Sequence, residues 1–161
     1  MTPRLTVIVP TYNQAGYLRE ALDTLRRQTL SDIEILVFNN ASTDDTAQLM
    51  NFVCFEDHRV GVLNRSRNIG PAANWSQGLG YGTGEYVALC CDDDLYAPRF
   101  LEQAVAMLDA YPSASFVHTA YRIIEPDGTL TGARVVSTRD AVWPGDAVFE
   151  SYLTRSHNVL L

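Results

Sequence analysis

Three consecutive aspartates, Asp92, Asp93 and Asp94, directly follow an apolar run that predicts a strand over residues 86–90. Carboxylate oxygens are the ligands that Mg²⁺ and Mn²⁺ prefer, and these ions keep further coordination positions for water and phosphate. The group therefore predicts a divalent-metal site that accepts a phosphate-bearing ligand. The alternative is that these carboxylates only cap the turn and the helix that begins near Pro98.

Polar residues also follow two earlier apolar runs, at residues 5–9 and 33–38. They are Thr11, Tyr12 and Asn13 after the first run, and Asn39 and Asn40 after the second. In an open parallel sheet, ligands bind beyond the carboxyl ends of the strands. The sequence therefore predicts that both groups meet the three aspartates at one edge of a sheet, which we call the carboxyl edge.

Two arginines bring positive charge to the same predicted edge. Arg65 and Arg67, together with Asn68, follow a short apolar run at residues 60–63. A guanidinium group can bind phosphate through two parallel hydrogen bonds, so both side chains are candidates for phosphate binding. The alternative is that they are solvated surface arginines.

The elements that must position these residues alternate along the chain, which predicts an α/β fold with a mostly parallel sheet. Strands are expected at residues 5–9, 33–38, 60–63, 86–90, 115–124 and 130–136, with the fourth buried and central. Helices are expected at residues 15–28, 72–79, 98–108 and 146–153. Ser42 and Asp45 resemble a capping box that opens one further helix. The segment PDGT, residues 126–129, predicts a turn.

Composition excludes several classes of protein. The 161 residues carry a formal net charge of −7, from 12 basic and 19 acidic side chains, which argues against binding to nucleic-acid polymers or anionic membranes. Every basic side chain is an arginine, which excludes a Walker-type phosphate loop and Schiff-base lysine chemistry in this chain. No apolar run approaches the roughly 18 residues of a transmembrane segment, so a soluble chain is expected.

The cysteines predict a reducing compartment. Cys54, Cys90 and Cys91 form no CxxC spacing, so neither a disulfide framework nor a zinc site is expected. The apolar stretch at the amino end is too short for a signal peptide. We therefore expect a cytoplasmic protein, with possible peripheral attachment to the inner membrane face through segments outside this chain.

Four blocks of sequence resemble a known family. They are VIVPTYNQAGYLREALDTLRRQT, ILVFNNASTDDT, RNIGPAANWSQGLGYGTGEYVAL and CCDDDLYAPRFLE, and together they cover roughly residues 4–105. In this order and spacing they resemble the inverting family 2 glycosyltransferases, which bind nucleotide sugars. The resemblance implies a three-layer, Rossmann-like GT-A fold with a mostly parallel central sheet. It also implies a single domain over residues 1–161, truncated on the acceptor-binding side.

The resemblance assigns the nucleotide-binding residues. Pro10, Thr11 and Tyr12 would form the base pocket, with Tyr12 offering a stacking face. Asn39 and Asn40 stand where the family usually has acidic residues that bind the base, and an amide can both accept and donate hydrogen bonds. Arg67 and Asn68 would lie beside the nucleotide, and Asn74 and Trp75 match a further family position.

The resemblance also assigns the metal-binding residues. Asp93 corresponds to the metal-binding carboxylate of the family's aspartate-rich motif, and Asp92 takes a role on the ribose side or the metal side. Cys91 occupies the first place of that motif, where the family often has aspartate. The implied cofactor is Mn²⁺ or Mg²⁺.

The implied reaction moves a sugar from a nucleotide diphosphate sugar, with a UDP-sugar favoured, to a glycan, lipid or other hydroxyl acceptor. No catalytic base is assigned, because in the family it comes from a later segment; we expect it beyond Leu161. The late carboxylates Asp127, Asp140, Asp146 and Glu150 lie in no recognised motif. The alternative function is a catalytically inert GT-A module that binds a nucleotide sugar or supports assembly.

Overall fold

A computed structural model of the chain describes residues 2–134. The chain divides between Val105 and Ala106 into two compact units, which are described separately below. Within residues 2–134, no helix has the length and apolar character that crossing a membrane requires.

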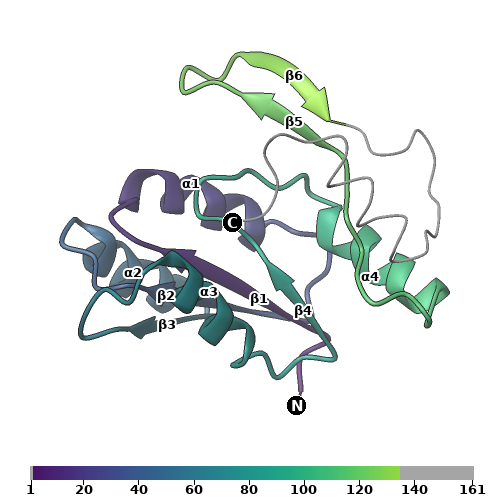
Figure 1. Ribbon diagram of the computed structural model, residues 1–161, viewed down its shortest axis with the longest axis horizontal. Coiled ribbons are helices and arrows are strands. Elements are labelled where there is room, and N and C mark those ends of the chain that lie inside the picture. Colours follow the sequence, from purple (N-terminus) through teal and green to yellow (C-terminus); the bar gives the residue numbers. More distant parts are fainter. Residues whose placement is uncertain (1, 135–161) are drawn as a thin grey trace. The chain divides into compact units, whose positions relative to one another are not determined.

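The first unit contains a four-stranded parallel sheet with the strand order β3-β2-β1-β4 (Figure 1). Its strands are β1 (Leu5–Thr11), β2 (Ile33–Asn39), β3 (Val60–Asn64) and β4 (Tyr86–Leu89). The pairing register places Thr11 beside Asn39 and Asn39 beside Asn64. Three strands therefore end in line, and the loops that follow them leave the sheet at one edge. This confirms the expected mostly parallel α/β fold.

Each strand of this sheet leads into a helix. The helices are α1 (Ala15–Arg26), α2 (Thr46–Glu56), α3 (Pro71–Leu79) and α4 (Phe100–Ala110). The chain steps from β1 to β2 and on to β3 in one direction, then returns past β1 to β4. Because parallel crossovers are right-handed, α1 and α2 cover one face of the sheet and α3 covers the other. This change of direction puts helices on both faces of the sheet, so the unit has three layers: helices, sheet and helix.

Alternating side chains of the strands build a core on each face. Leu18, Leu22 and Leu25 of α1 are fully buried in one cluster with Val7 and with the other inward residues of β1 and β2. On the opposite face, Gly78 of α3 lies so close to Ile8 and Phe38 that a Cβ atom there would contact both side chains. A buried strand with both faces covered is the arrangement that the continuous apolar runs predict.

The structure corrects the prediction for the fourth strand. β4 is not central; it pairs with β1 and has no other strand partner within residues 2–134. Val87 and Leu89 are 41% and 38% exposed. The apolar run at residues 86–90 gave no information about strand order, which depends on the direction in which the chain returns through α3.

Two local predictions are also wrong. Ser42 does not cap α2, because the helix begins at Thr46 and the Ser42 Oγ atom accepts a hydrogen bond from the backbone N–H of Asn13. Pro98 precedes α4 by two residues, and its carbonyl oxygen accepts from the backbone N–H of Thr29. Both residues instead make a contact with a segment distant in the sequence.

In the second unit, the described residues include an antiparallel hairpin of β5 (Tyr121–Ile124) and β6 (Leu130–Arg134). The expected turn at residues 126–129 is confirmed, with Gly128 at a φ of 84°. The strand expected at residues 115–124 is shorter, because residues 115–120 form no strand. Residues 135–136 of the sixth expected strand and the helix expected at residues 146–153 lie outside the described residues.

A pair of identical substitutions tests this packing. A Cβ atom on Gly84 would lie 2.7 Å from the backbone nitrogen of Thr6 and 2.9 Å from the carbonyl oxygen of Tyr86, whereas nothing lies within 4 Å of one on Gly16 in α1. We expect Gly84→Ala to lower the free energy of unfolding by about 1–3 kcal/mol. Gly16→Ala should raise it by up to about 1 kcal/mol. Urea unfolding measures both, and equal effects would contradict the close approach at Gly84.

Candidate functional site

The loop after β1 and the loop after β2 hold each other at the carboxyl edge. The backbone N–H of Asn13 donates to Ser42 Oγ at 2.9 Å, and the Asn13 side-chain oxygen accepts from the backbone N–H of Thr43 at 2.7 Å. Asn13 adopts a φ of 54°, a left-handed conformation that asparagine tolerates better than most residues. The two loops therefore form one connected surface.

Asp44 fastens the start of α1 to the same loop. Its carboxylate accepts hydrogen bonds from the backbone N–H of Ala15 at 2.9 Å and from the backbone N–H of Thr46 at 3.1 Å. Burial alone would raise the pKa of this carboxyl group, but these bonds and that of the Thr46 hydroxyl lower it overall. Asp44 is thus held as an anion, with a structural part in this edge of the sheet.

Asn39 and Asn40 point into the protein. They are 4% and 2% exposed, and each amide has a protein partner on both its nitrogen and its oxygen. Asn39 donates to the side chain of Asn64 at 2.8 Å and accepts from the backbone N–H of Ser42 at 3.0 Å. Asn40 donates to the side chain of Asn68 at 3.0 Å and accepts from the backbone N–H of Ile69 at 2.9 Å. Both residues therefore link the loops after β2 and β3.

The other residues of the predicted base pocket divide into buried and exposed groups. Pro10 and Thr11 are buried, and the Thr11 hydroxyl has no hydrogen-bond partner among residues 2–134. Tyr12 is 44% exposed, so its ring is available as a stacking surface. A buried hydroxyl that the protein leaves unpaired next to an exposed ring is an arrangement that a bound base can complete.

The two arginines that follow β3 differ in environment. Arg67 is exposed, whereas Arg65 is half-buried and donates from Nε to the side-chain oxygen of Asn74 at 2.7 Å. Asn74 is itself buried and donates to the carbonyl oxygen of Phe38 at 2.8 Å. Asn74 therefore orients the side chain of Arg65, and Arg67 is the more accessible of the two cations.

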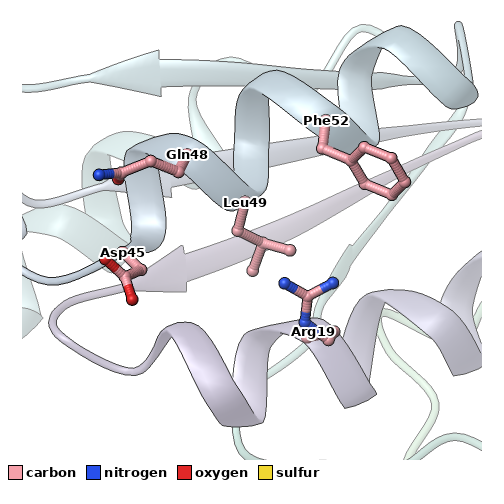
Figure 2. A pocket seen from close by; sticks show the side chains of 5 residues that line it. All are labelled: Arg19, Asp45, Gln48, Leu49 and Phe52. Carbon is pink, nitrogen blue, oxygen red and sulfur yellow. The ribbon is translucent and has the colours of Figure 1, made fainter.

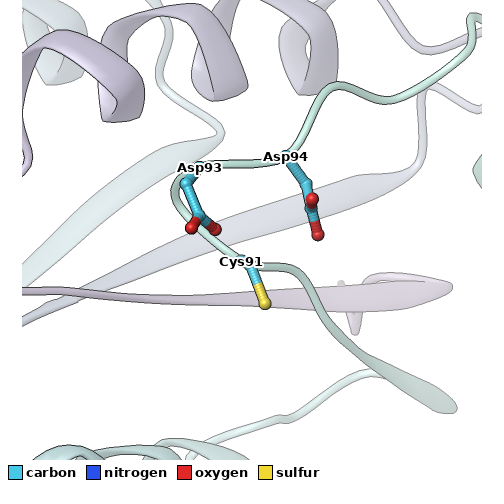
Figure 3. A group of neighbouring side chains, drawn as sticks. All are labelled: Cys91, Asp93 and Asp94. Carbon is cyan, nitrogen blue, oxygen red and sulfur yellow. The ribbon is translucent and has the colours of Figure 1, made fainter. Parts of the chain in front are cut away.

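The aspartates lie in the loop between β4 and α4, residues 91–97, which we call the acidic loop. Figure 3 shows Asp93 and Asp94 with their side chains toward the same side of this loop as Cys91. One ligand atom from each of these three residues lies within 4.8 Å of the other two. Asp93 and Asp94 are exposed, so their carboxylates form the accessible pair.

Asp92 lies apart from that pair. Its Oδ2 atom is buried and has no hydrogen-bond partner within residues 2–134. Burial raises the pKa of the Asp92 carboxyl group, although the nearby Thr11 hydroxyl favours its charged form. Burial and the charge of Asp93 also raise the pKa of Asp94. The acidic loop thus holds more negative charge than its surroundings neutralise, and this excess favours the binding of a cation.

Cys91 is an unsuitable ligand for such a cation. Burial, followed by the charges of Asp94 and Asp93, raises the pKa of its thiol to about 11. The group is therefore a neutral thiol at physiological pH, and Mg²⁺ and Mn²⁺ prefer oxygen ligands. A thiol with a raised pKa is also a poor nucleophile. The exposed carboxylates are therefore the groups of this cluster that suit such a cation.

Two surface depressions lie outside the acidic loop. One, of about 400 Å³, lies between α1 and α2 and is lined by Arg19, Asp45, Gln48, Leu49 and Phe52 (Figure 2). The other includes Asp32, Glu34 and His58, near the amino ends of β2 and β3. Neither contains a predicted site residue. The candidate site is thus defined by converging loops.

Of the four late carboxylates, Asp127 is the one that lies within the described residues. Asp127 lies in the β5–β6 turn and accepts from the backbone N–H of Thr129 at 2.9 Å. That hydrogen bond lowers the pKa of its carboxyl group, which makes it a weaker proton acceptor. Asp140, Asp146 and Glu150 lie outside the described residues.

Comparison with known proteins decides the family. The family model described as glycosyl transferase family 2 matches residues 6–156. The chain belongs to glycosyl transferase family 2. The acidic loop, the loops of the carboxyl edge and all of the parallel sheet except Leu5 lie within the matched residues.

Relatives in the family include proteins with named substrates. The GalNAc(5)-diNAcBac-PP-undecaprenol beta-1,3-glucosyltransferase of Campylobacter jejuni is 32% identical over 131 residues, which are 80% of this chain and 41% of that protein. The structure of S. aureus TarS 1–349 in complex with UDP-GlcNAc has a TM-score of 0.62 and 29% identity, covering 70% of this chain and 32% of TarS.

A second structural relative contains a metal ion. The mannosyltransferase PcManGT from Pyrobaculum calidifontis, in complex with GDP-Man and Mn²⁺, has a TM-score of 0.61 and 26% identity, covering 79% of this chain and 37% of that chain. These solved relatives establish the GT-A fold for this family member. The chain spans less than half the length of each relative named here.

Sequence reasoning placed Asn13 at the carboxyl edge and Ser42 in a capping box, but it did not predict that they hold the loops together with Asp44. Asn13, Ser42 and Asp44 make most of the contacts between the loops after β1 and β2. Their only signal was a run of small polar residues after each strand, which is typical of any turn. The pairing of particular donors and acceptors depends on three-dimensional proximity.

The raised pKa of Asp92 gives a prediction for stability. Its charged form is disfavoured in the folded state, so the parent loses stability as the pH rises from the ordinary value of 3.8 through the raised folded pKa. Asn has the same shape without the charge. We therefore expect Asp92→Asn to be more stable than the parent at neutral pH, without added metal, and the difference to vanish at acidic pH.

Asp57 provides a control for which the expected change in stability has the opposite sign. The Asp57 carboxylate accepts hydrogen bonds from the Arg59 guanidinium at 3.0 and 2.8 Å, and these lower its pKa. Asp57→Asn should therefore destabilise the protein at neutral pH, with the loss shrinking as the pH falls. Urea unfolding with EDTA across this pH range measures both variants; a less stable Asp92→Asn at neutral pH contradicts the assignment.

Proposed function

We propose that this chain is the donor-binding part of a glycosyltransferase that moves a sugar from a nucleotide diphosphate sugar to an acceptor hydroxyl with the help of a divalent cation. The observation that carries the proposal is the exposed pair of carboxylates, Asp93 and Asp94, at the carboxyl edge where the loops after β1, β2 and β3 converge. The proposal is supported by family membership and by the ligands of the solved relatives.

The donor set fits Mn²⁺ or Mg²⁺. Carboxylate oxygens of Asp93 and Asp94 lie close enough to share one ion, and a hard divalent cation needs few protein ligands. When bound there, the ion would neutralise the negative charge that develops on the departing diphosphate. We assign Asp93 as the principal metal-binding residue and give Asp92, which lies beside Thr11, the ribose side of the nucleotide.

Base recognition falls to the residues that the protein leaves available. The amides of Asn39 and Asn40 already have partners within the protein, so they shape the floor of the site. The Tyr12 ring can stack on the base, and the unpaired Thr11 hydroxyl can bind a polar group of the nucleoside. We propose that the exposed side chains of Arg67 and Asn68 bind the diphosphate.

The solved relatives bind nucleotide sugars that differ in their base. One is in complex with UDP-GlcNAc and another with GDP-Man, so both a pyrimidine and a purine base occur among them. We propose a UDP-sugar as the donor and a glycan, lipid or other hydroxyl compound as the acceptor. The relative from Campylobacter jejuni, named for an undecaprenol-linked substrate, supports the inclusion of lipid-linked glycans among the acceptors to be tested.

Nucleotide binding provides the first test. At about 100 times its dissociation constant, a ligand that binds the folded state alone stabilises it by about 2.7 kcal/mol. We therefore expect UDP with Mn²⁺ to raise the Tm by about 5–10 °C. GDP, TDP and CDP are tested in parallel, each with and without Mn²⁺. The absence of any shift, or a shift that is independent of metal, would favour an inert module over a metal-assisted transferase.

Asp93 provides the second test. Asp93→Asn keeps the shape of the side chain and removes the charge that attracts a hard cation. We expect Mn²⁺-dependent UDP binding to weaken, while the stability of the ligand-free protein changes little or rises slightly because a like charge has been removed. Titration calorimetry measures the binding. The matched control is Asp32→Asn, an exposed residue just before β2 and at the opposite end of that strand from the carboxyl edge, which should bind like the parent; equal binding by Asp93→Asn would contradict the assignment.

A further inference from the structure

Gln28 lies just after α1 and is only 6% exposed, which is unusual for a long polar side chain. Its amide nitrogen donates to the carbonyl oxygen of Ala97 at 2.7 Å, and it also lies 3.4 Å from that of Tyr96 and 3.3 Å from that of Thr24. Its amide oxygen accepts from the backbone N–H of Leu101 at 2.9 Å. One side chain therefore connects α1, the acidic loop and the start of α4.

The neighbours of Gln28 strengthen this connection. The Thr24 hydroxyl accepts a hydrogen bond from the backbone N–H of Tyr96 at 3.1 Å. The backbone N–H of Thr29 donates to the carbonyl oxygen of Pro98 at 2.8 Å. The carboxyl end of α1 thus fixes the end of the acidic loop through both side-chain and backbone groups.

The beginning of the acidic loop is fixed separately. The backbone N–H of Cys90 donates to the carbonyl oxygen of Ile8 at 2.9 Å, which extends the pairing of β4 with β1. The Tyr96 hydroxyl then donates to the carbonyl oxygen of Cys91 at 3.0 Å, so the two ends of the loop are tied together. Between these ties the Asp93 side chain makes no hydrogen bond or ion pair within residues 2–134, and its position depends on the backbone.

We infer that Gln28 is a positioning residue that sets the separation of the Asp93 and Asp94 carboxylates, and thereby the affinity of the site for a divalent cation. The inference rests on the proposed function. An amide suits this position because the side chain must donate a hydrogen bond to carbonyl groups of the loop and accept one from a backbone N–H of α4. A methionine of similar length can do neither, so the loop would lose its link to α1.

The test compares Gln28→Met with a matched control elsewhere in the same unit. Thr6 is a buried residue whose hydroxyl accepts from the backbone N–H groups of Thr83 and Gly84, at 3.1 and 2.9 Å, near the amino end of β1. Thr6→Val removes that contact far from the acidic loop. Both variants should lower the Tm, but only Gln28→Met should change the affinity for Mn²⁺.

Titration calorimetry with Mn²⁺, well below the Tm of each variant, measures that affinity. We expect Gln28→Met to bind Mn²⁺ about 10- to 100-fold more weakly than the parent, the range typical of residues that orient metal ligands. Thr6→Val should bind like the parent. If Gln28→Met does not fold, Tyr96→Phe carries the test, since it removes only the hydroxyl that ties the loop at Cys91; a weaker affinity than the parent is expected there too.

The outcomes separate this inference from the proposed function. If Asp93→Asn loses Mn²⁺ affinity while Gln28→Met and Tyr96→Phe keep it, the positioning role is overturned and the metal site stands. If Asp93→Asn binds Mn²⁺ as well as the parent, the proposed metal site is overturned and the inference with it. A loss in Thr6→Val equal to that in Gln28→Met would show a general effect of lower stability and would also overturn the positioning role.

Discussion

Parallel pairing on both sides of β1 is the constraint on which the rest of this protein depends. β1 bonds to β2 on one side and to β4 on the other, and each pair runs in the same direction. Every strand of this sheet must therefore deliver its following loop to the same edge. The polar residues after β1, β2 and β3 and the aspartates after β4 are neighbours for this reason, although more than 70 residues separate the first group from the last.

The loops at this edge are joined mainly by neutral groups. Asparagine amides and backbone groups make the links between the loops after β1, β2 and β3, while negative charge is concentrated in the acidic loop. A buried polar group costs little when each of its donors and acceptors has a partner, and Asn39 and Asn40 satisfy that condition. Asp44 is the charged exception among these links, and the carboxylates of Asp93 and Asp94 stay exposed above a largely neutral framework.

The sequence predicted the layers well and the contacts between loops poorly. Leu18, Leu22 and Leu25 repeat at helical spacing, and a helix with one buried face is the direct consequence of that spacing. The continuous apolar runs likewise predict buried parallel strands. The edge position of β4 could not be predicted, because apolar residues such as Val87 and Leu89 would suit a central strand equally well. The resemblance pointed to the acidic loop. Gln28 lies in the first of the resembling blocks, but its contacts could not be predicted, because its partners lie 69 and 73 residues away in the sequence.

The uncharged links of the carboxyl edge have a consequence for the response to salt. Dissolved ions screen interactions between charges, with a Debye length of about 8 Å at physiological ionic strength, and have little effect on hydrogen bonds between amides. Added salt therefore weakens the mutual repulsion of Asp92, Asp93 and Asp94 while the bonds of Asn39 and Asn40 persist. The protein thus has a largely neutral framework that responds weakly to ionic strength and an acidic loop that responds strongly to it.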